Sequence, residues 1–387
     1  MIQLLVEKHG DTMELALLQD EQLVQFIVEE GTAAAVPEQI VLGRVGRVMP
    51  NLHAAFVYLP GSEEGFLPFD EIPDKSRPQP GQSRMVQVKK AASRGKAAYL
   101  TQDIALAGRY AVLLPLGQTG HASARAQGDD RARLRTLAQA LAPQGMGLVL
   151  RSNSLLAAER DIRAQVECLA GQWAMVQDRA RQLTAPATLL PAPDPVSALL
   201  RDLPEQPQRI LTNDLACIPA VEVPVAQAEH PFLLYRVRDS LLKALKRRVH
   251  LKSGGELVID PCEAMTVIDV NTASATQGKH RARTLLTTNL EAVAEAARLM
   301  RLRNMGGIIL IDLIDMDSRE DREMVLAAFQ KALESDPVKT VVHGMTSLGL
   351  LEVTRRKTSE SLSSQRLRPC PCCGGSGQHM MPDKEGA

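Results

Sequence analysis

Two apolar runs near the C-terminal end of the chain carry acidic residues. Asp269 lies in the run Met265–Asn271, and Asp312 lies in the run Ile308–Asp315. An ionised carboxylate in such a run loses its hydration, which costs several kcal/mol unless a proton, a basic partner or a metal ion compensates it. Two such runs together indicate a shared cation.

Oxygen atoms dominate this candidate metal site. Side chains alternate along a strand, so Asp269 and Asn271 share one face, and Asp312 adds an oxygen from a neighbouring strand. Oxygen ligands without nearby His or Cys favour Mg²⁺ or Mn²⁺ over zinc, with water and a phosphate filling the other positions. Asp315 is expected in a turn or a helix cap. Spacing alone leaves open that all these acids merely end strands.

Cysteines are concentrated at the other candidate metal site. Three of the six lie between Cys370 and Cys373, and glycines follow. In a reducing compartment the C-x-x-C pair Cys370 and Cys373 predicts half of a zinc site, which a second copy of the chain would complete. The alternative is an unmetallated or redox-active tail. The remaining cysteines are expected to be buried bystanders: Cys168, Cys217 and Cys262.

Composition limits the class of protein. A length of 387 residues is enough for two to four domains. The 45 basic residues balance the 45 acidic ones, so a phosphate-binding surface must be local, and the basic segment 236–252 is one candidate. No apolar run is long enough for a signal peptide or a membrane span, so we expect a cytoplasmic protein.

Short strands separated by glycine turns follow a small strand layer at residues 1–35. Between residues 40 and 90 they predict a small barrel of the OB type. Exposed aromatic residues on such a barrel, here Phe56 and Phe66, stack on bases, while Lys90 and Lys96 neutralise phosphates. The structural alternative is that both phenylalanines belong to the barrel core.

The rest of the chain reads as alternating helices and strands. Helices are expected at 129–141 and 157–181 around a strand at 146–151, and a proline-rich connector at 184–208 follows. Further elements lead to an α/β layer around the acidic strands. They are a strand at 209–212, a helix at 232–248, a hairpin of 256–260 with 265–271, a helix at 287–303, a strand at 338–343 and a helix at 348–357.

Taken together, these motifs resemble the ribonuclease E/G family of bacterial endoribonucleases. The resemblance covers nearly the whole chain and is densest from Lys246 to Gly377. Its motifs are Ala54-Ala55-Phe56-Val57, Gly65-Phe66-Leu67-Pro68, Met146 to Arg151, Ser253-Gly254-Gly255, Ile268-Asp269-Val270-Asn271, Thr288 to Ala292, Gly306-Gly307, Ile311 to Met316, Gly349 to Glu352 and the C-P-x-C sequence at Cys370.

The resemblance implies roles for individual residues. Asp269 and Asp312 match the family's catalytic magnesium ligands, and Asn271 matches their supporting residue. Phe56, Phe66 and Lys96 match residues that contact RNA. Arg151, followed by Ser152, matches the arginine that binds an RNA 5′-monophosphate. Cys370 and Cys373 match cysteines that share zinc between the two chains of a homodimer.

The resemblance also implies an α/β multi-domain fold. A ribonuclease H-like subdomain contains an inserted OB-type barrel and a 5′-sensor region, and a deoxyribonuclease I-like catalytic subdomain follows. The expected bounds are 1–36 with 188–244 for the ribonuclease H-like part, 37–105 for the barrel, 106–187 for the sensor, 245–368 for the catalytic part, 369–377 for the zinc-link and 378–387 for a tail.

The implied function is Mg²⁺-dependent hydrolysis of single-stranded RNA to 5′-phosphate and 3′-hydroxyl ends, in ribosomal RNA processing or messenger RNA decay, with a preference for 5′-monophosphorylated RNA. An alternative is a non-catalytic RNA-binding or ribosome-assembly factor that retains the fold. Ser152 stands where the family commonly has Thr, and Leu42 stands where a basic residue is common. The chain ends ten residues after Gly377, so a zinc-linked dimer is the largest assembly expected.

Overall fold

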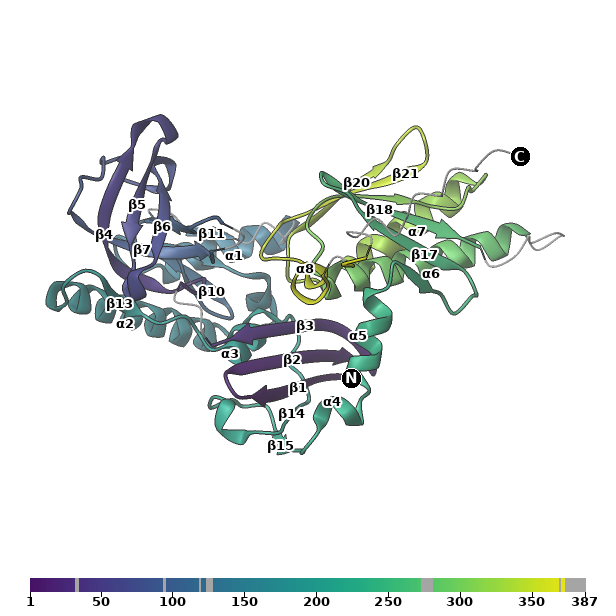
Figure 1. Ribbon diagram of the computed structural model, residues 1–387, viewed down its shortest axis with the longest axis horizontal. Coiled ribbons are helices and arrows are strands. Elements are labelled where there is room, and N and C mark those ends of the chain that lie inside the picture. Colours follow the sequence, from purple (N-terminus) through teal and green to yellow (C-terminus); the bar gives the residue numbers. More distant parts are fainter. Residues whose placement is uncertain are drawn as a thin grey trace.

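The computed structural model describes residues 1–31, 35–92, 95–117, 120–122, 128–272, 281–368 and 370–372. The fold is mixed α/β, and these residues form four sheets. In Figure 1 the barrel and the candidate sensor region, called the sensor region below, lie on the left, the N-terminal sheet lies below, and the C-terminal sheet lies on the right. Among the described residues, none of the helices combines the length and the apolar character needed to cross a lipid bilayer.

The N-terminal sheet has the order β15-β14-β1-β2-β3 and is buried on both faces. Leu4 of β1 packs in a cluster with Leu199 of α3, whereas its neighbour Leu5 packs in a cluster with Phe232 of α4. The elements are β1 (Ile2–His9), β2 (Thr12–Gln19), β3 (Gln22–Glu30), α3 (Pro195–Asp202), β14 (Arg209–Thr212), β15 (Val225–Gln227), α4 (Pro231–Leu234) and α5 (Val237–Leu245).

The expected OB-type barrel is confirmed as a closed, five-stranded, OB-like barrel. The order is β4-β5-β6-β8-β7, and a direct β4–β7 pairing closes it. The strands are β4 (Ile40–Met49), β5 (Ala54–Tyr58), β6 (Glu64–Pro68), β7 (Ser83–Lys90) and β8 (Ala98–Thr101). Strand β13 (Ala187–Leu190) from the proline-rich segment also pairs with β4, so the expected boundary at residue 188 cuts through a strand of this sheet.

The sensor region packs two helices against a small sheet of order β11-β12-β10-β9. Its core includes Leu113, Leu148 and Trp173, and it extends to Leu42 of the barrel. The expected helices around a strand are confirmed. The elements are β9 (Leu106–Ala107), β10 (Ala111–Leu114), β11 (Gly120–Ala122), α1 (Gly128–Leu141), β12 (Gly147–Leu150) and α2 (Glu159–Gln182).

The C-terminal sheet has the order β16-β17-β18-β19-β21-β20. One face packs against α6 and α7, and Ile268 and Ile311 are fully buried there. Because successive side chains of a strand point to opposite faces, Asp269 and Asp312 lie on the face away from these helices. The elements are β16 (Arg248–His250), β17 (Glu256–Pro261), β18 (Met265–Asn271), α6 (Arg281–Leu302), β19 (Gly307–Asp312), α7 (Arg319–Leu333), β20 (Thr340–Met345), β21 (Leu350–Arg355) and α8 (Leu362–Arg366).

Two helix predictions are wrong in this part of the chain. The segment 348–357 contains strand β21, because it pairs with β19 on one side and β20 on the other. The predicted helix at 232–248 is two helices, since Arg236 between them has a left-handed φ of 50°. It also ends at Leu245, before strand β16.

A buried ion pair joins β21 to the segment after α7. Arg355 and Asp336 each expose 2% of the side chain, and Arg355 Nε donates to Asp336 Oδ2 at 2.7 Å. Arg355 Nη1 also donates to the Asn304 side chain and to the Met305 carbonyl, both at 2.9 Å. The pair thus ties the ends of three elements together at the far end of the sheet from Asp312.

We expect Asp336→Ala to lower the free energy of unfolding by about 3–5 kcal/mol, because it leaves the Arg355 charge buried without its carboxylate. Asp239→Ala is the matched control, since it removes the exposed Arg236–Asp239 pair and should cost less than about 1 kcal/mol. Thermal unfolding followed by circular dichroism compares the two. Equal shifts in the two variants would contradict the structural role assigned to Asp336.

Candidate functional site

The two acidic strands lie side by side. Strands β18 and β19 are parallel neighbours, and Asp269 is paired directly with Asp312. Neighbouring strands are about 4.8 Å apart, and paired residues point to the same face of a sheet. Asp269 is half-buried and Asp312 is exposed. The structure therefore brings two carboxylates together on the face opposite the helices, at the carboxyl ends of both strands.

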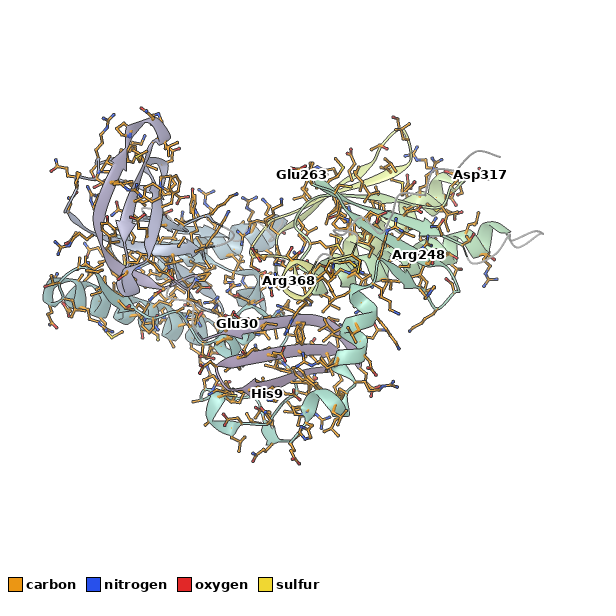
Figure 2. All side chains as sticks on the ribbon, viewed as in Figure 1. His9, Glu30, Arg248, Glu263, Asp317 and Arg368 are labelled. Atoms are coloured by element: carbon orange, nitrogen blue, oxygen red, sulfur yellow. The ribbon has the colours of Figure 1, made fainter. Side chains whose placement is uncertain are left out.

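Two labels in Figure 2 mark the two ends of this sheet, and the end that carries Asp269 and Asp312 is called the acidic edge below. Glu263 marks the turn between β17 and β18, and Asp317 marks the loop that follows β19. The two labels lie at opposite ends of the sheet, and Asp317 is at the end away from the barrel. Asp269 and Asp312 belong to the Asp317 end, since both lie at or near the carboxyl ends of their strands.

Asn271 contacts Asp269 directly. Its Nδ2 donates to Asp269 Oδ2 at 2.8 Å. The NH₂ group thus faces the carboxylate, so Asn271 fixes the orientation of Asp269. The amide oxygen is the end of Asn271 that would be offered to a metal ion or a water molecule.

The donor set fits a hard divalent cation. Two carboxylates and one amide supply only oxygen ligands, which suits Mg²⁺ or Mn²⁺ with water completing the coordination. Within the described ranges, no three His, Cys, Asp or Glu side chains converge in a metal-binding cluster. The acidic edge therefore suits an ion that keeps several waters, and not a closed zinc site.

Helix α6 holds both loops beside the acidic edge. Asn289 is fully buried; its Nδ2 donates to the Ile314 carbonyl at 2.8 Å, and its Oδ1 accepts from the Ile314 N–H at 3.1 Å. This pair of bonds fixes the chain two residues after Asp312. In the sequence, Asn289 stands out only as part of the motif Thr288 to Ala292. Its position on the apolar face of a helix indicates a buried polar group that must find hydrogen-bond partners.

Glu291 fixes the second loop. Its carboxylate accepts hydrogen bonds from the backbone N–H groups of Lys252 and Ser253. Burial acts to raise the pKa of Glu291, but the bonds from Ser253 and Lys252 outweigh it and hold the pKa below its ordinary value. Gly255 completes the loop, because a Cβ there would lie 2.8 Å from the Asn271 carbonyl oxygen.

The basic segment 236–252 is largely neutralised by its own neighbours. Four of its arginines form ion pairs, as Arg236–Asp239, Arg238–Glu14, Arg247–Asp260 and Arg248–Glu256. Glu14 also accepts from Arg366 of α8, so it links β2 to α5 and α8. The segment therefore mainly holds elements together, and its capacity for phosphate is smaller than the sequence suggests.

The barrel presents aromatic side chains on its outer surface. Phe56 of β5 and Phe66 of β6 are paired across the strands, and their ring centroids are 5.7 Å apart at an interplanar angle of 66°. Both rings are half-buried, while the alternate residues Val57 and Leu67 fill the core. The two phenylalanines therefore do not belong to the barrel core.

Cations lie beside this aromatic surface. Lys90 Nζ lies 5.6 Å from the ring centroid of Tyr99, and the Arg47 guanidinium lies 5.2 Å from that of Phe56. Lys96 is exposed, two residues before β8. Neither Tyr99 nor Arg47 stands out in the sequence, because their positions beside the two phenylalanines depend on the strand register.

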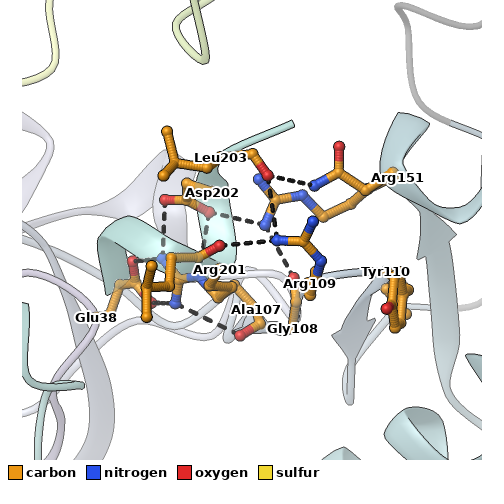
Figure 3. A network of polar contacts seen from close by, with 12 residues as sticks. Glu38, Ala107, Gly108, Arg109, Tyr110, Arg151, Arg201, Asp202 and Leu203 are labelled. Carbon is orange, nitrogen blue, oxygen red and sulfur yellow. Dashed lines mark hydrogen bonds and ion pairs between the residues drawn. The ribbon is translucent and has the colours of Figure 1, made fainter. Parts of the chain in front are cut away.

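The candidate 5′-phosphate arginine already has an acidic partner. Figure 3 shows Arg151 in a network with Asp202 and Arg201. Arg151 Nη1 donates to Asp202 Oδ1 and to the Gly108 carbonyl, both at 2.8 Å. Arg201 in turn binds Glu38 through both terminal nitrogens, at 2.6 and 2.7 Å. Asp202 therefore already neutralises part of the charge that Arg151 would offer to a phosphate.

Ion pairing favours the charged forms of Asp202 and Arg201. Burial acts to raise the pKa of Asp202, but Arg201 and Arg151 outweigh it and lower the pKa below its ordinary value. The pKa of Arg201 is raised, since its bonds to Glu38 and Asp202 outweigh the effect of burial. Ser152 follows Arg151 at the start of a short 3₁₀ segment, Ser152–Leu156, and is half-buried.

The structure describes only part of the candidate zinc-link. Cys370 is exposed, and Cys373 lies outside the described residues. The prediction that the other cysteines are buried is wrong for Cys168 and Cys262, which are exposed. Cys168 lies on the outer face of α2, and Cys262 lies in the turn between β17 and β18.

Comparison with known proteins gives one consistent result. The sequence model of the ribonuclease E/G family matches residues 105–358. Ribonuclease E of Synechocystis is 34% identical over 413 residues, which cover 99% of this chain and 60% of that protein. Ribonuclease G of Haemophilus influenzae and of Escherichia coli K12 are each 31% identical, and the matches cover 97% of this chain and 84% of those proteins. The chain thus spans about 60% of the length of the ribonuclease E relative.

Proposed function

Because the chain belongs to the ribonuclease E/G family, we propose that it is a metal-dependent endoribonuclease that cleaves single-stranded RNA in RNA processing or decay. The observation that carries this proposal is the direct pairing of Asp269 with Asp312. Two carboxylates held side by side on a sheet face attract a divalent cation, and the RNA-cleaving relatives support a catalytic use for that cation.

Asp269 and Asp312 would hold a single Mg²⁺ or Mn²⁺ ion, and Asn271 would keep Asp269 in position through its hydrogen bond. When bound, such an ion polarises a phosphate oxygen and lowers the pKa of a coordinated water. The products would carry 5′-phosphate and 3′-hydroxyl ends. Asn289 and Glu291 keep the two flanking loops in place, so the carboxylates need little rearrangement on binding.

The barrel would hold the RNA strand. Phe56 and Phe66 offer ring surfaces to bases, while Lys90 and the exposed Lys96 offer charge to phosphates. Stacking depends little on base identity, so sequence preference should be loose. A non-catalytic RNA-binding factor would keep these contacts and show no cleavage, so an activity assay separates the two functions.

We expect Asp269→Asn and Asp312→Asn each to reduce cleavage below roughly one hundredth of the native rate, because each removes a charged metal ligand. Asp315→Asn is the matched control, since Asp315 is exposed and lies only three residues after Asp312. Gel analysis of a 5′-labelled single-stranded RNA, with MgCl₂ and with EDTA, measures the rates. Native turnover in either aspartate variant, or in EDTA, would contradict the metal assignment.

The sensor region is proposed to favour RNA with a 5′-monophosphate. Arg151 suits this role because its planar guanidinium makes paired, charge-assisted bonds to phosphate. Asp202 holds it in place before RNA binds. A dianionic monophosphate attracts Arg151 more strongly than a single carboxylate does, and Asp202 keeps Arg201 as a partner when Arg151 leaves.

We expect the native chain to cleave 5′-monophosphorylated RNA faster than the 5′-triphosphorylated form of the same RNA. Arg151→Lys should bring the ratio of the two rates close to one, because a lysine cannot make the paired bonds. Arg163→Lys on α2 is the control, since Arg163 forms only an exposed pair with Glu159. A ratio unchanged by Arg151→Lys would rule out Arg151 as the sensor.

A zinc-linked homodimer is the proposed assembly. Its support is the C-x-x-C spacing of Cys370 and Cys373, and the exposure of Cys370. Two such pairs would give the tetrahedral thiolate site that zinc favours.

We expect the double variant Cys370→Ser, Cys373→Ser to lose bound zinc and to become monomeric, because serine does not replace a thiolate ligand. Atomic absorption and light scattering measure the two effects. Cys168→Ser, on the outer face of α2, is the control and should change neither. A dimer that persists without zinc would count against the shared site.

A further inference from the structure

We propose that Tyr99 provides a third base-stacking position on the barrel, so that the barrel holds three successive bases of a single strand between Arg47 and Lys90. The proposal rests on the RNA-binding role proposed for the barrel above. It adds a third stacking residue and sets the length of the bound segment at three bases. It assigns functions to Tyr99 and Arg47, neither of which was singled out by sequence.

The three rings form one row across adjacent strands. Phe56 of β5 is paired with Phe66 of β6, and Phe66 is paired with Tyr99 of β8. The centroids of Phe66 and Tyr99 are 6.3 Å apart at an interplanar angle of 50°. Ala98 and Leu100, on either side of Tyr99, are fully buried in the barrel core, so alternation directs the tyrosine ring outward.

The spacing of the rings suits a single strand. Successive centroids are 5.7 and 6.3 Å apart, well above the rise of about 3.4 Å between stacked bases in a duplex. Bases placed on separate rings would therefore be further apart than in a duplex and unstacked from one another. Unstacked bases on aromatic side chains are typical of single-stranded RNA recognition.

Hydrogen bonding holds the third ring in place. The Tyr99 hydroxyl donates to Glu71 Oε1 at 3.2 Å, and Glu71 also accepts from Lys89 Nζ at 2.7 Å. Burial and the negative charge of Glu71 raise the pKa of Tyr99, so the phenol stays protonated and keeps this bond at neutral pH. A ring that is already fixed loses little side-chain entropy when a base stacks on it.

A cation marks each end of the row. The Arg47 guanidinium lies 5.2 Å from the Phe56 centroid and is also paired with Glu64 at 3.2 Å. Lys90 Nζ lies 5.6 Å from the Tyr99 centroid, on the strand next to β8. These positions suit contacts with the phosphates that flank a three-base segment.

The test compares Tyr99→Ala and Tyr99→Leu with Tyr99→Phe in the full chain. Asp312→Asn is present in every protein so that the RNA stays intact. Fluorescence anisotropy measures binding of a labelled single-stranded decanucleotide. We expect Tyr99→Ala and Tyr99→Leu to weaken binding by about 5- to 150-fold, the range for losing one stacked base. Tyr99→Phe keeps the ring and should stay within about twofold.

A scan with single abasic nucleotides locates the position. With Tyr99 present, abasic substitution should weaken binding at three successive positions of the RNA. With Tyr99→Leu, the loss should vanish at one terminal position and remain at the other two. Tyr99→Leu fills the space of the ring without a flat π-face, so it separates stacking from folding; circular dichroism checks that it folds.

Two results would overturn the proposal. The third stacking position is contradicted if Tyr99→Leu binds RNA with native affinity. It is also contradicted if the abasic scan shows only two sensitive positions with Tyr99 present. Phe56→Ala and Phe66→Ala distinguish this from failure of the proposed function. If these two variants weaken binding and Tyr99→Leu does not, only the third position is lost. If none of the three weakens binding, the barrel is not the RNA-binding surface.

Discussion

The parallel pairing of β18 with β19 is the contact on which the candidate site depends. Parallel strands require a crossover, and here α6 makes it, so the helix covers one face while the carboxylates stand on the other. The same helix supplies Asn289 and Glu291 to the loops beside the acidic edge. One topological unit therefore creates the site and also holds it in position.

Paired charges serve a different purpose elsewhere in the chain. Arg201 joins α3 to Glu38 near the barrel, and Arg151 joins the sensor region to the same helix through Asp202. Glu14 joins the N-terminal sheet to α5 and α8. Such pairs connect elements that lie far apart in sequence, so they govern how the sheets are joined. Asp269 and Asp312 differ from them because each faces a like charge.

The sequence predicted the local elements that have strong patterns. Apolar runs, glycine turns and helix stops indicated the acidic strands, the barrel and α6, and their motifs indicated the family. It failed at 348–357, where pairing with two neighbouring strands overrides a helical pattern of apolar residues. The prediction of one continuous helix also failed at Arg236, because an arginine gives no indication of a left-handed backbone conformation.

Contacts across strands and between distant segments were beyond the sequence. The pairing of Tyr99 with Phe66 depends on strand register, and the bond between Arg151 and Asp202 spans 51 residues. Residue spacing does not predict the strand pairing. The balanced charge of the chain does not indicate which acidic residue pairs with Arg151. The roles of Asp269, Asp312, Cys370 and Cys373 as metal ligands stay predictions, as do the RNA contacts of Phe56, Phe66, Lys90 and Lys96.

The like charges at Asp269 and Asp312 have a thermodynamic consequence. Without a counter-ion their repulsion favours separation of the two strands, so the candidate site is also a weak point of the sheet. Any divalent ion that binds only the folded chain stabilises it by mass action. A divalent ion at the candidate site would then raise the thermal stability of the fold, and a substitution that removes one of the two charges would raise the stability of the metal-free chain.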